Sequence, residues 1–107
     1  MVIFAPPGPL LTGVAVMTPC TVELAGRPVV IRESRRPWKK NHGIFYPAGD
    51  RGRDVAEIVI SKGLTPSKQI ETVIHEMLHA LFYFLDEDVV DHAGGELTEA
   101  LERLELI

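Results

Sequence analysis

Hydrophobic residues follow two different spacings along this chain of 107 residues. Up to residue 64 they come in short runs separated by Pro and Gly, which is typical of strands joined by turns. From residue 65 onward they recur every three or four positions, which is typical of amphipathic helices. The runs that predict strands cover residues 10–17, 20–26, 27–34, 43–47 and 55–63. The last two flank the polar turn "AGDRGRD" and therefore predict a hairpin.

A first helix is predicted from Thr65 to about Phe84. Thr65 can cap its N-terminus, and Pro66 suits the first helical position because that residue needs no N–H partner. On a helical wheel, one apolar stripe faces the core and is formed by Ile70, Val73, Ile74, Met77, Leu81 and Leu85.

A second helix is predicted from about Asp88 to Leu106, with Asp86 or Asp88 as its cap. Its apolar stripe is formed by Val90, Ala93, Leu97, Leu101 and Leu104. Because the connection is short, the two helices should pack antiparallel. Gly94 and Gly95 lie inside this helix, which indicates either close approach of the first helix or a kink between two shorter helices.

Together these elements predict an α+β fold within one domain, residues 1–107. A strand and turn region, 1–64, supplies a small antiparallel or mixed sheet, and the two-helix region, 65–107, packs against it. The length allows one hydrophobic core and no second domain.

The charge and the cysteine count narrow the partners and the compartment. A net charge of −4 argues against general binding of nucleic acid or anionic membranes, and the basic run "RRPWKK" around Trp38 is more typical of a solvated loop, as is His42. The single Cys20 suits a reducing compartment. The apolar N-terminal run is interrupted by prolines and lacks the basic start of a signal peptide, so we expect a cytoplasmic protein.

The segment "HEMLH" carries the candidate chemistry. His75 and His79 are one helical turn apart, so both imidazoles can reach one point on the polar face of the first helix. Two imidazoles are half of a tetrahedral Zn²⁺ site. Glu76 beside them is the candidate general base for a water activated by the ion. A surface helix with two histidines and no metal is the alternative interpretation.

A three-ligand zinc site needs one more side chain, and the second helix is the source. If the chain folds back around Asp86, His92 lies at the height of the histidine pair, and Glu96 would orient His75 through its free ring nitrogen. Glu87 and Asp91 form a rival pair. Glu87 requires the first helix to end near Phe82, because otherwise it lies roughly 9 Å beyond His79 along the helix axis. His92 is the favoured third ligand, with Glu87, Asp91 and Glu96 as alternatives.

With these residues placed, the chain resembles the zincins, the zinc metallopeptidases with an HExxH helix. More narrowly, "TVIHEMLHALFYFLDEDVVDHAGGELTEAL" is similar to compact SprT-like and phage-type metallopeptidases, in which HExxHA is followed by an acidic LDE turn and a closing helix. The resemblance implies His75 and His79 as ligands and Glu76 as the base. It also implies that a peptide substrate would lie along "AEIVIS" as the edge strand of the sheet. The chain lacks the longer metzincin motif and a cysteine zinc ribbon.

The function predicted from the sequence is therefore that of a zinc-dependent hydrolase, a metallopeptidase that cleaves a peptide or related amide bond. Its partner would be a peptide or protein substrate. The alternative is a zinc-containing binding or regulatory module without proteolytic activity.

Overall fold

The structure is a computed structural model that describes residues 4–5, 16–35 and 42–107. Two short strands, β1 (Phe4–Ala5) and β2 (Val16–Met17), pair antiparallel with each other. The predicted strand at 10–17 is seen only at its end, in β2, and its start lies outside the described residues. Most of the basic run around Trp38 also lies outside the described residues, and only Arg35 of this run is described.

The other four strands form one mixed sheet with the order β3-β4-β6-β5. Strands β3 and β4 are antiparallel and joined by a tight turn, in which Ala25 and Gly26 both have positive φ. Strand β6 then pairs parallel with β4 and antiparallel with β5. The predicted α+β class with a small mixed sheet is confirmed. The strand bounds are β3 (Cys20–Leu24), β4 (Arg27–Ser34), β5 (Gly43–Tyr46) and β6 (Ala56–Ser61).

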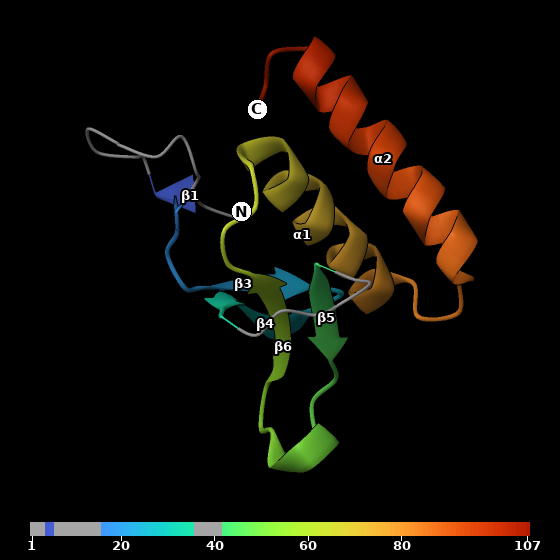
Figure 1. Ribbon diagram of the computed structural model, residues 1–107. Coiled ribbons are helices and arrows are strands. Elements are labelled where there is room, and N and C mark those ends of the chain that lie inside the picture. Colours follow the sequence, from blue (N-terminus) through green and yellow to red (C-terminus); the bar gives the residue numbers. More distant parts are fainter. Residues whose placement is uncertain (1–3, 6–15, 36–41) are drawn as a thin grey trace.

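The predicted hairpin is formed by β5 and β6. Its loop contains the short 3-10 helix η1 (Asp50–Gly52), and it extends away from the helices in Figure 1. Gly49 and Gly52 have φ of 91° and 76°, which glycine adopts without steric penalty. The loop therefore reverses the chain and leaves β5 at the edge of the sheet.

Helix α1 (Pro66–Leu81) covers one face of the sheet (Figure 1). Its N-terminus is capped as predicted, because the Thr65 hydroxyl accepts a hydrogen bond from the backbone N–H of Lys68 at 3.3 Å. Alternate residues of the strands point toward it, as the period of a strand requires. The core between helix and sheet includes Val22, Val29, Ile31, Ala56, Ile58, Ile60 and Val73.

Strand β5 approaches α1 closely at Gly43. A Cβ atom at this position would lie 2.8 Å from Thr72 Cγ2, which is closer than packed atoms allow, and 3.1 Å from the backbone oxygen of Val59, which is a tight contact. Glycine therefore lets the edge strand lie directly against the polar side of the helix. This contact brings β5 beside the residues of the candidate site.

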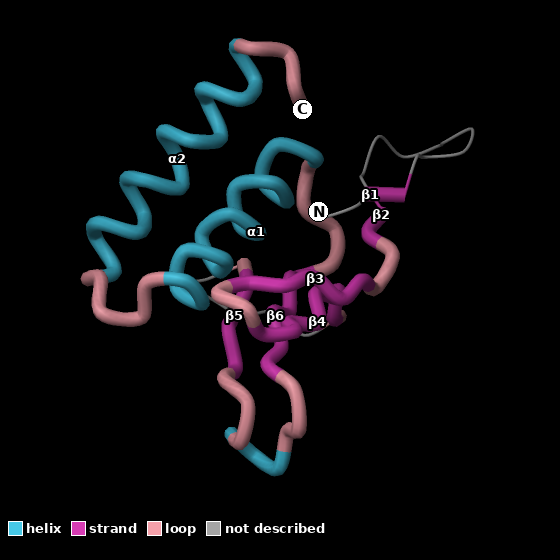
Figure 2. Tube along the Cα trace, turned by 180° about the vertical axis from the view of Figure 1, so that it is seen from behind, coloured by secondary structure: helices cyan, strands magenta, loops and turns pink. Residues whose placement is uncertain are grey.

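Helix α2 (Glu87–Arg103) packs antiparallel on α1, on the side away from the sheet (Figures 1 and 2). Val90, Gly94 and Thr98 are the buried residues of this helix. At the far end of the pair, the Ser67 hydroxyl donates a hydrogen bond of 2.7 Å to Glu102. Neither helix in the described part of the chain is long and apolar enough to cross a membrane.

Gly94 and Gly95 differ in their surroundings. A Cβ at Gly94 would be 3.6 Å from Cα of His75, so the two helix backbones approach each other here. A Cβ at Gly95 would meet nothing within 4 Å. Because α2 is a continuous helix across both residues, close approach at Gly94 is the correct interpretation and the kink is not.

Both helix boundaries differ from the sequence prediction at the turn between the helices. Helix α1 ends at Leu81 and not at Phe84, because Phe82 leaves the helical region with φ −131° and ψ 65°. A turn follows, in which the N–H of Leu85 donates to the carbonyl of Phe82 at 3.0 Å. Helix α2 then begins at Glu87, one residue early, after Asp86 at the N-cap position. This earlier turn changes which residues face each other across the two helices.

Candidate metal centre

His75 and His79 lie on the face of α1 that the sequence predicted, and their rings converge. The ring centroids are 4.8 Å apart with an edge-to-face angle of 69°. The two Nε2 atoms are 3.1 Å apart. Both side chains are partly buried, with 17% and 25% of their surface exposed, so each imidazole has a restricted position while one edge remains open to solvent.

Glu87 lies beside both histidines of this pair. Its Oε2 lies 3.0 Å from Nε2 of His75 and 3.0 Å from Nε2 of His79. Glu87 reaches them because α1 ends at Leu81, so the first residue of α2 turns back over the end of α1. A carboxylate in the first turn of a helix is also favoured by the helix dipole. We call His75, His79 and Glu87 the histidine centre.

His92, the favoured third ligand from the sequence, is not brought to the pair. It is exposed on α2 and lines a shallow depression with Asp91, Gly95, Glu96 and others. The sequence-based alignment placed His75 level with Leu97, whereas the structure packs Gly94 against His75. The earlier end of α1 accounts for this shift of three residues. Of the four candidates, Glu87 occupies the third position.

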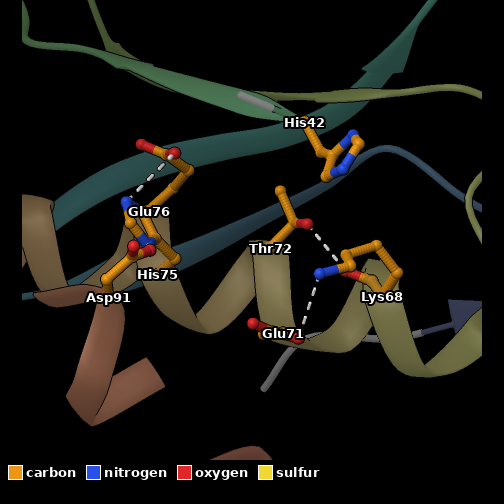
Figure 3. Close-up of a pocket in the computed structure, with 7 residues that line it drawn as sticks. All are labelled: His42, Lys68, Glu71, Thr72, His75, Glu76 and Asp91. Carbon is orange, nitrogen blue, oxygen red and sulfur yellow. Dashed lines mark hydrogen bonds and ion pairs between the residues drawn. The ribbon is translucent and has the colours of Figure 1, made fainter. Parts of the chain in front are cut away.

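Asp91 contacts the outer side of the histidine centre. Its Oδ1 lies 3.3 Å from Nδ1 of His75, the ring nitrogen that faces away from Glu87. In Figure 3, Asp91 comes from α2 toward His75. An oxygen at this nitrogen orients the ring and favours the tautomer whose Nε2 has a free lone pair. The sequence assigned this task to Glu96, which lies elsewhere, in the depression beside His92.

Glu76, the predicted base, lies next to the centre without being part of it. Its Oε2 is 4.0 Å from Nε2 of His75, and only 6% of its side chain is exposed. Burial raises the pKa of the Glu76 carboxyl, while the nearby His75 and His79 lower it and Glu87 raises it further. A carboxyl with a raised pKa accepts a proton more readily, which suits a general base.

The three ligand atoms fit a small divalent cation in spacing and in type. Tetrahedral Zn²⁺ with bonds near 2.1 Å separates its ligand atoms by about 3.4 Å. The separations here are 3.0, 3.0 and 3.1 Å, so outward movements of a few tenths of an ångström accommodate the ion. Two imidazoles and one carboxylate are also a known ligand set of catalytic zinc. Within the described ranges, this is the group whose ligand atoms converge in this way.

Two cavities adjoin the centre, and Glu76 lines both. The smaller has a volume of about 190 Å³ and polar walls that include His42, Lys68 and Asp91 (Figure 3). The larger has a volume of about 560 Å³ and lies between β5 and the turn that follows α1. His42 is exposed, as predicted. The sequence did not predict that it lines the smaller cavity.

The strand beside the centre is β5 and not the strand "AEIVIS". That segment is β6, which lies between β4 and β5 inside the sheet. In the part of the chain that the structure describes, the outer edge of β5 pairs with no strand. Gly43, Ile44 and Phe45 of this strand line the larger cavity. The interpretation of β6 as the edge strand is therefore wrong, and β5 has that position.

Comparisons of the chain with protein-family models, with curated proteins and with solved structures find no match. Functional interpretation therefore depends on the geometry of the histidine centre. Two features of the sequence could have indicated that Glu87 and Asp91 lie at the histidine centre. Asp86 as a cap places Glu87 at the first position of α2, and Glu87 and Asp91 are four residues apart on one helical face.

Proposed function

We propose that this chain is a zinc-dependent hydrolase that cleaves a peptide or related amide bond. The observation that carries the proposal is the convergence of His75 Nε2, His79 Nε2 and Glu87 Oε2 within 3.1 Å of one another, with a buried carboxylate beside them. A bound zinc ion would supply Lewis acidity, which acidifies a water molecule and polarises a carbonyl group.

The chain's own residues have separate tasks in this proposal. His75, His79 and Glu87 hold the ion, and Asp91 keeps the His75 ring in place. Glu76 accepts a proton from the attacking water and then donates it to the departing amine. Its position supports this role, because its carboxylate is close to the centre yet is not one of the three converging groups.

The larger cavity and the outer edge of β5, which pairs with no strand among the described residues, support an extended peptide as the substrate. A peptide segment can add to an unpaired strand edge through main-chain hydrogen bonds, largely independent of its sequence. Strand β5 presents such an edge next to the histidine centre, since its residues line the same cavity as Glu76, His79 and Glu87. A peptide bound along β5 would therefore pass beside the catalytic group.

The substitution Glu76→Gln tests the proposal. The amide keeps the shape of the side chain but accepts no proton, so we expect peptide cleavage to fall by about 10²- to 10⁴-fold while zinc remains bound. Cleavage of a mixed peptide library, read by mass spectrometry, and zinc content by elemental analysis give the two readouts.

Glu99→Gln is the matched control, because Glu99 is an exposed carboxylate of α2 that pairs with Arg103 at 3.1 Å. It should keep both zinc and cleavage. Cleavage that persists in zinc-loaded Glu76→Gln would contradict the assigned base. A protein that binds zinc and a partner equally well with either residue at 76, and cleaves nothing, would instead be a binding or regulatory module.

A further inference from the structure

The larger cavity beside the histidine centre is lined by side chains of two kinds, apolar and ionisable. The walls are mostly carbon and come from two elements, with Ile44, Phe45 and Pro47 from β5 and its exit and Tyr83 from the turn after α1. The polar side chains are Glu76, His79 and Glu87, all of which belong to the proposed catalytic group. An occupant of this cavity would therefore touch apolar surface and the proposed catalytic group at the same time.

Resting on the proposed function, we propose that this cavity is a specificity pocket that binds a large apolar side chain, aliphatic or aromatic, next to the bond that is cleaved. Its volume of about 560 Å³ is within the range of ligand pockets and accommodates such a side chain. Burial of an apolar group against these walls removes it from water, which favours binding.

Charged side chains fit the cavity less well. An acidic side chain would meet the carboxylates of Glu76 and Glu87, which line the cavity. A basic side chain would be attracted to these carboxylates only where the bound ion left them unneutralised, and the apolar walls would remove it from water without a partner. The polar cavity on the other side of Glu76 has no comparable apolar wall. The two sides of the site therefore differ in polarity, and the apolar side is the selective one.

Tyr83 is the wall residue that can be changed without disturbing the core. Its surface is 86% exposed, whereas Phe45 packs against the hydrophobic core. Phe84 is its neighbour in the same turn and is 70% exposed, but it does not line the cavity. The ring of Phe84 packs edge-to-face on that of Tyr83, with 5.7 Å between the centroids, so Leu97 on α2, which is 46% exposed and does not line the cavity, is the better control. Tyr83→Ser and Leu97→Ser thus form a matched pair, in which each removes an exposed apolar side chain and only the first changes the pocket.

The experiment measures the affinity of the zinc-loaded protein for three hydroxamic acids, which chelate zinc without being cleaved. Acetohydroxamic acid has no side group, 3-phenylpropanohydroxamic acid has an apolar one, and 6-aminohexanohydroxamic acid has a basic one. We expect the phenyl compound to bind about 10- to 100-fold more tightly than acetohydroxamic acid. Tyr83→Ser should reduce this ratio at least about threefold, and Leu97→Ser should leave it unchanged.

The outcomes separate this inference from the proposed function. Equal affinity for the three compounds, or tightest binding of the amine, would overturn the apolar pocket and leave the zinc centre intact. An equal loss in both variants would also overturn it, because the effect would then not come from the cavity wall. Failure of all three compounds to bind would overturn the zinc centre itself and this inference with it.

Discussion

Two carboxylates of this chain, Glu57 and Glu87, each lie between two nitrogen-bearing side chains, but their partners differ. Glu57 on β6 is held by Arg32 at 3.0 Å and by Arg53 at 3.3 Å, and we call these three residues the arginine centre. Glu87 lies 3.0 Å from each of two histidines. Arginine is always charged, whereas histidine is charged only when it is protonated, so only the first carboxylate has permanent cations beside it.

The pKa of Glu57 and that of Glu76, the carboxyl next to the histidine centre, shift in opposite directions. Hydrogen bonds and charge from Arg32, with a further contribution from Arg53, lower the pKa of Glu57 despite its partial burial. Beside the histidine centre, burial raises the pKa of Glu76 and outweighs the lowering by His75 and His79, and the charge of Glu87 raises it further. Among the described residues, no lysine or arginine forms an ion pair with Glu76 or Glu87.

The comparison separates a structural ion-pair group from a candidate reactive one. The arginine centre carries its own permanent cations and connects β4 to β6 and to the loop before β6. The histidine centre gathers lone pairs and negative charge that a divalent cation would neutralise. A buried carboxyl with a shifted pKa in a cavity is also typical of catalytic sites.

Two further substitutions, Asp91→Asn and Glu57→Gln, test the comparison. Asp91→Asn, which removes the carboxylate on the outer side of the histidine centre, should have the larger effect. Asp91→Asn weakens the acceptor 3.3 Å from Nδ1 of His75, so we expect zinc affinity to fall by about 10- to 100-fold. Competition with a chelating dye measures this affinity. Asp88→Asn, an exposed change in the same turn of α2, is the control. Equal affinity of both variants and the wild type would show that Asp91 has no role in the centre.

Substitution at the arginine centre should have a smaller effect, and on stability alone. Glu57→Gln should lower the free energy of unfolding at pH 7 by roughly 0.5–1 kcal/mol, since its ion pairs are partly exposed. The lowered pKa of Glu57 means that its contribution is present above the ordinary pKa of a glutamate and is lost as the pH falls through its native pKa. The difference between wild type and variant should therefore shrink below about pH 4.

Urea unfolding at several pH values measures this difference, with Glu23→Gln as an exposed control on β3. The zinc affinity of Glu57→Gln should equal that of the wild type, because the two centres share no residue. A constant difference across pH would contradict the role given to the arginines. A loss of zinc affinity would contradict the independence of the two centres.

The sequence predicted the part of the site that lies within one helix. His75, Glu76 and His79 are fixed relative to one another by the period of α1, so local pattern was sufficient to place them. The cap at Thr65 gave the start of the helix for the same reason. Features decided by residues near in sequence were thus accessible without the structure.

The third position depended on where α1 ends, and the sequence pattern did not show this. Apolar residues continue at helical spacing to Leu85, beyond the actual end at Leu81. Helix ends are set by capping and tertiary contacts more than by periodicity. Because α1 ends three residues earlier than predicted, Glu87 lies beside the two histidines in place of His92. For the same reason, Asp91 contacts His75 in place of Glu96.

The order of the strands was also beyond the local pattern. The hairpin of β5 and β6 was predictable from its turn, but its pattern does not say which strand pairs with β4. One signal was present in the sequence, because the neighbours Ile58 and Val59 are both apolar although they point to opposite faces of the sheet. In the structure both are nearly fully buried. Consecutive apolar residues of this kind are typical of an internal strand.

Zinc content after exhaustive dialysis tests the central claim most directly, for the wild type and for Glu87→Ala and His92→Ala. We predict one zinc ion per chain in the wild type and in His92→Ala, and its loss in Glu87→Ala, because Glu87, and not His92, converges with His75 and His79. Retention of zinc by Glu87→Ala together with its loss from His92→Ala would contradict the account. A wild-type chain that binds no zinc would contradict it as well.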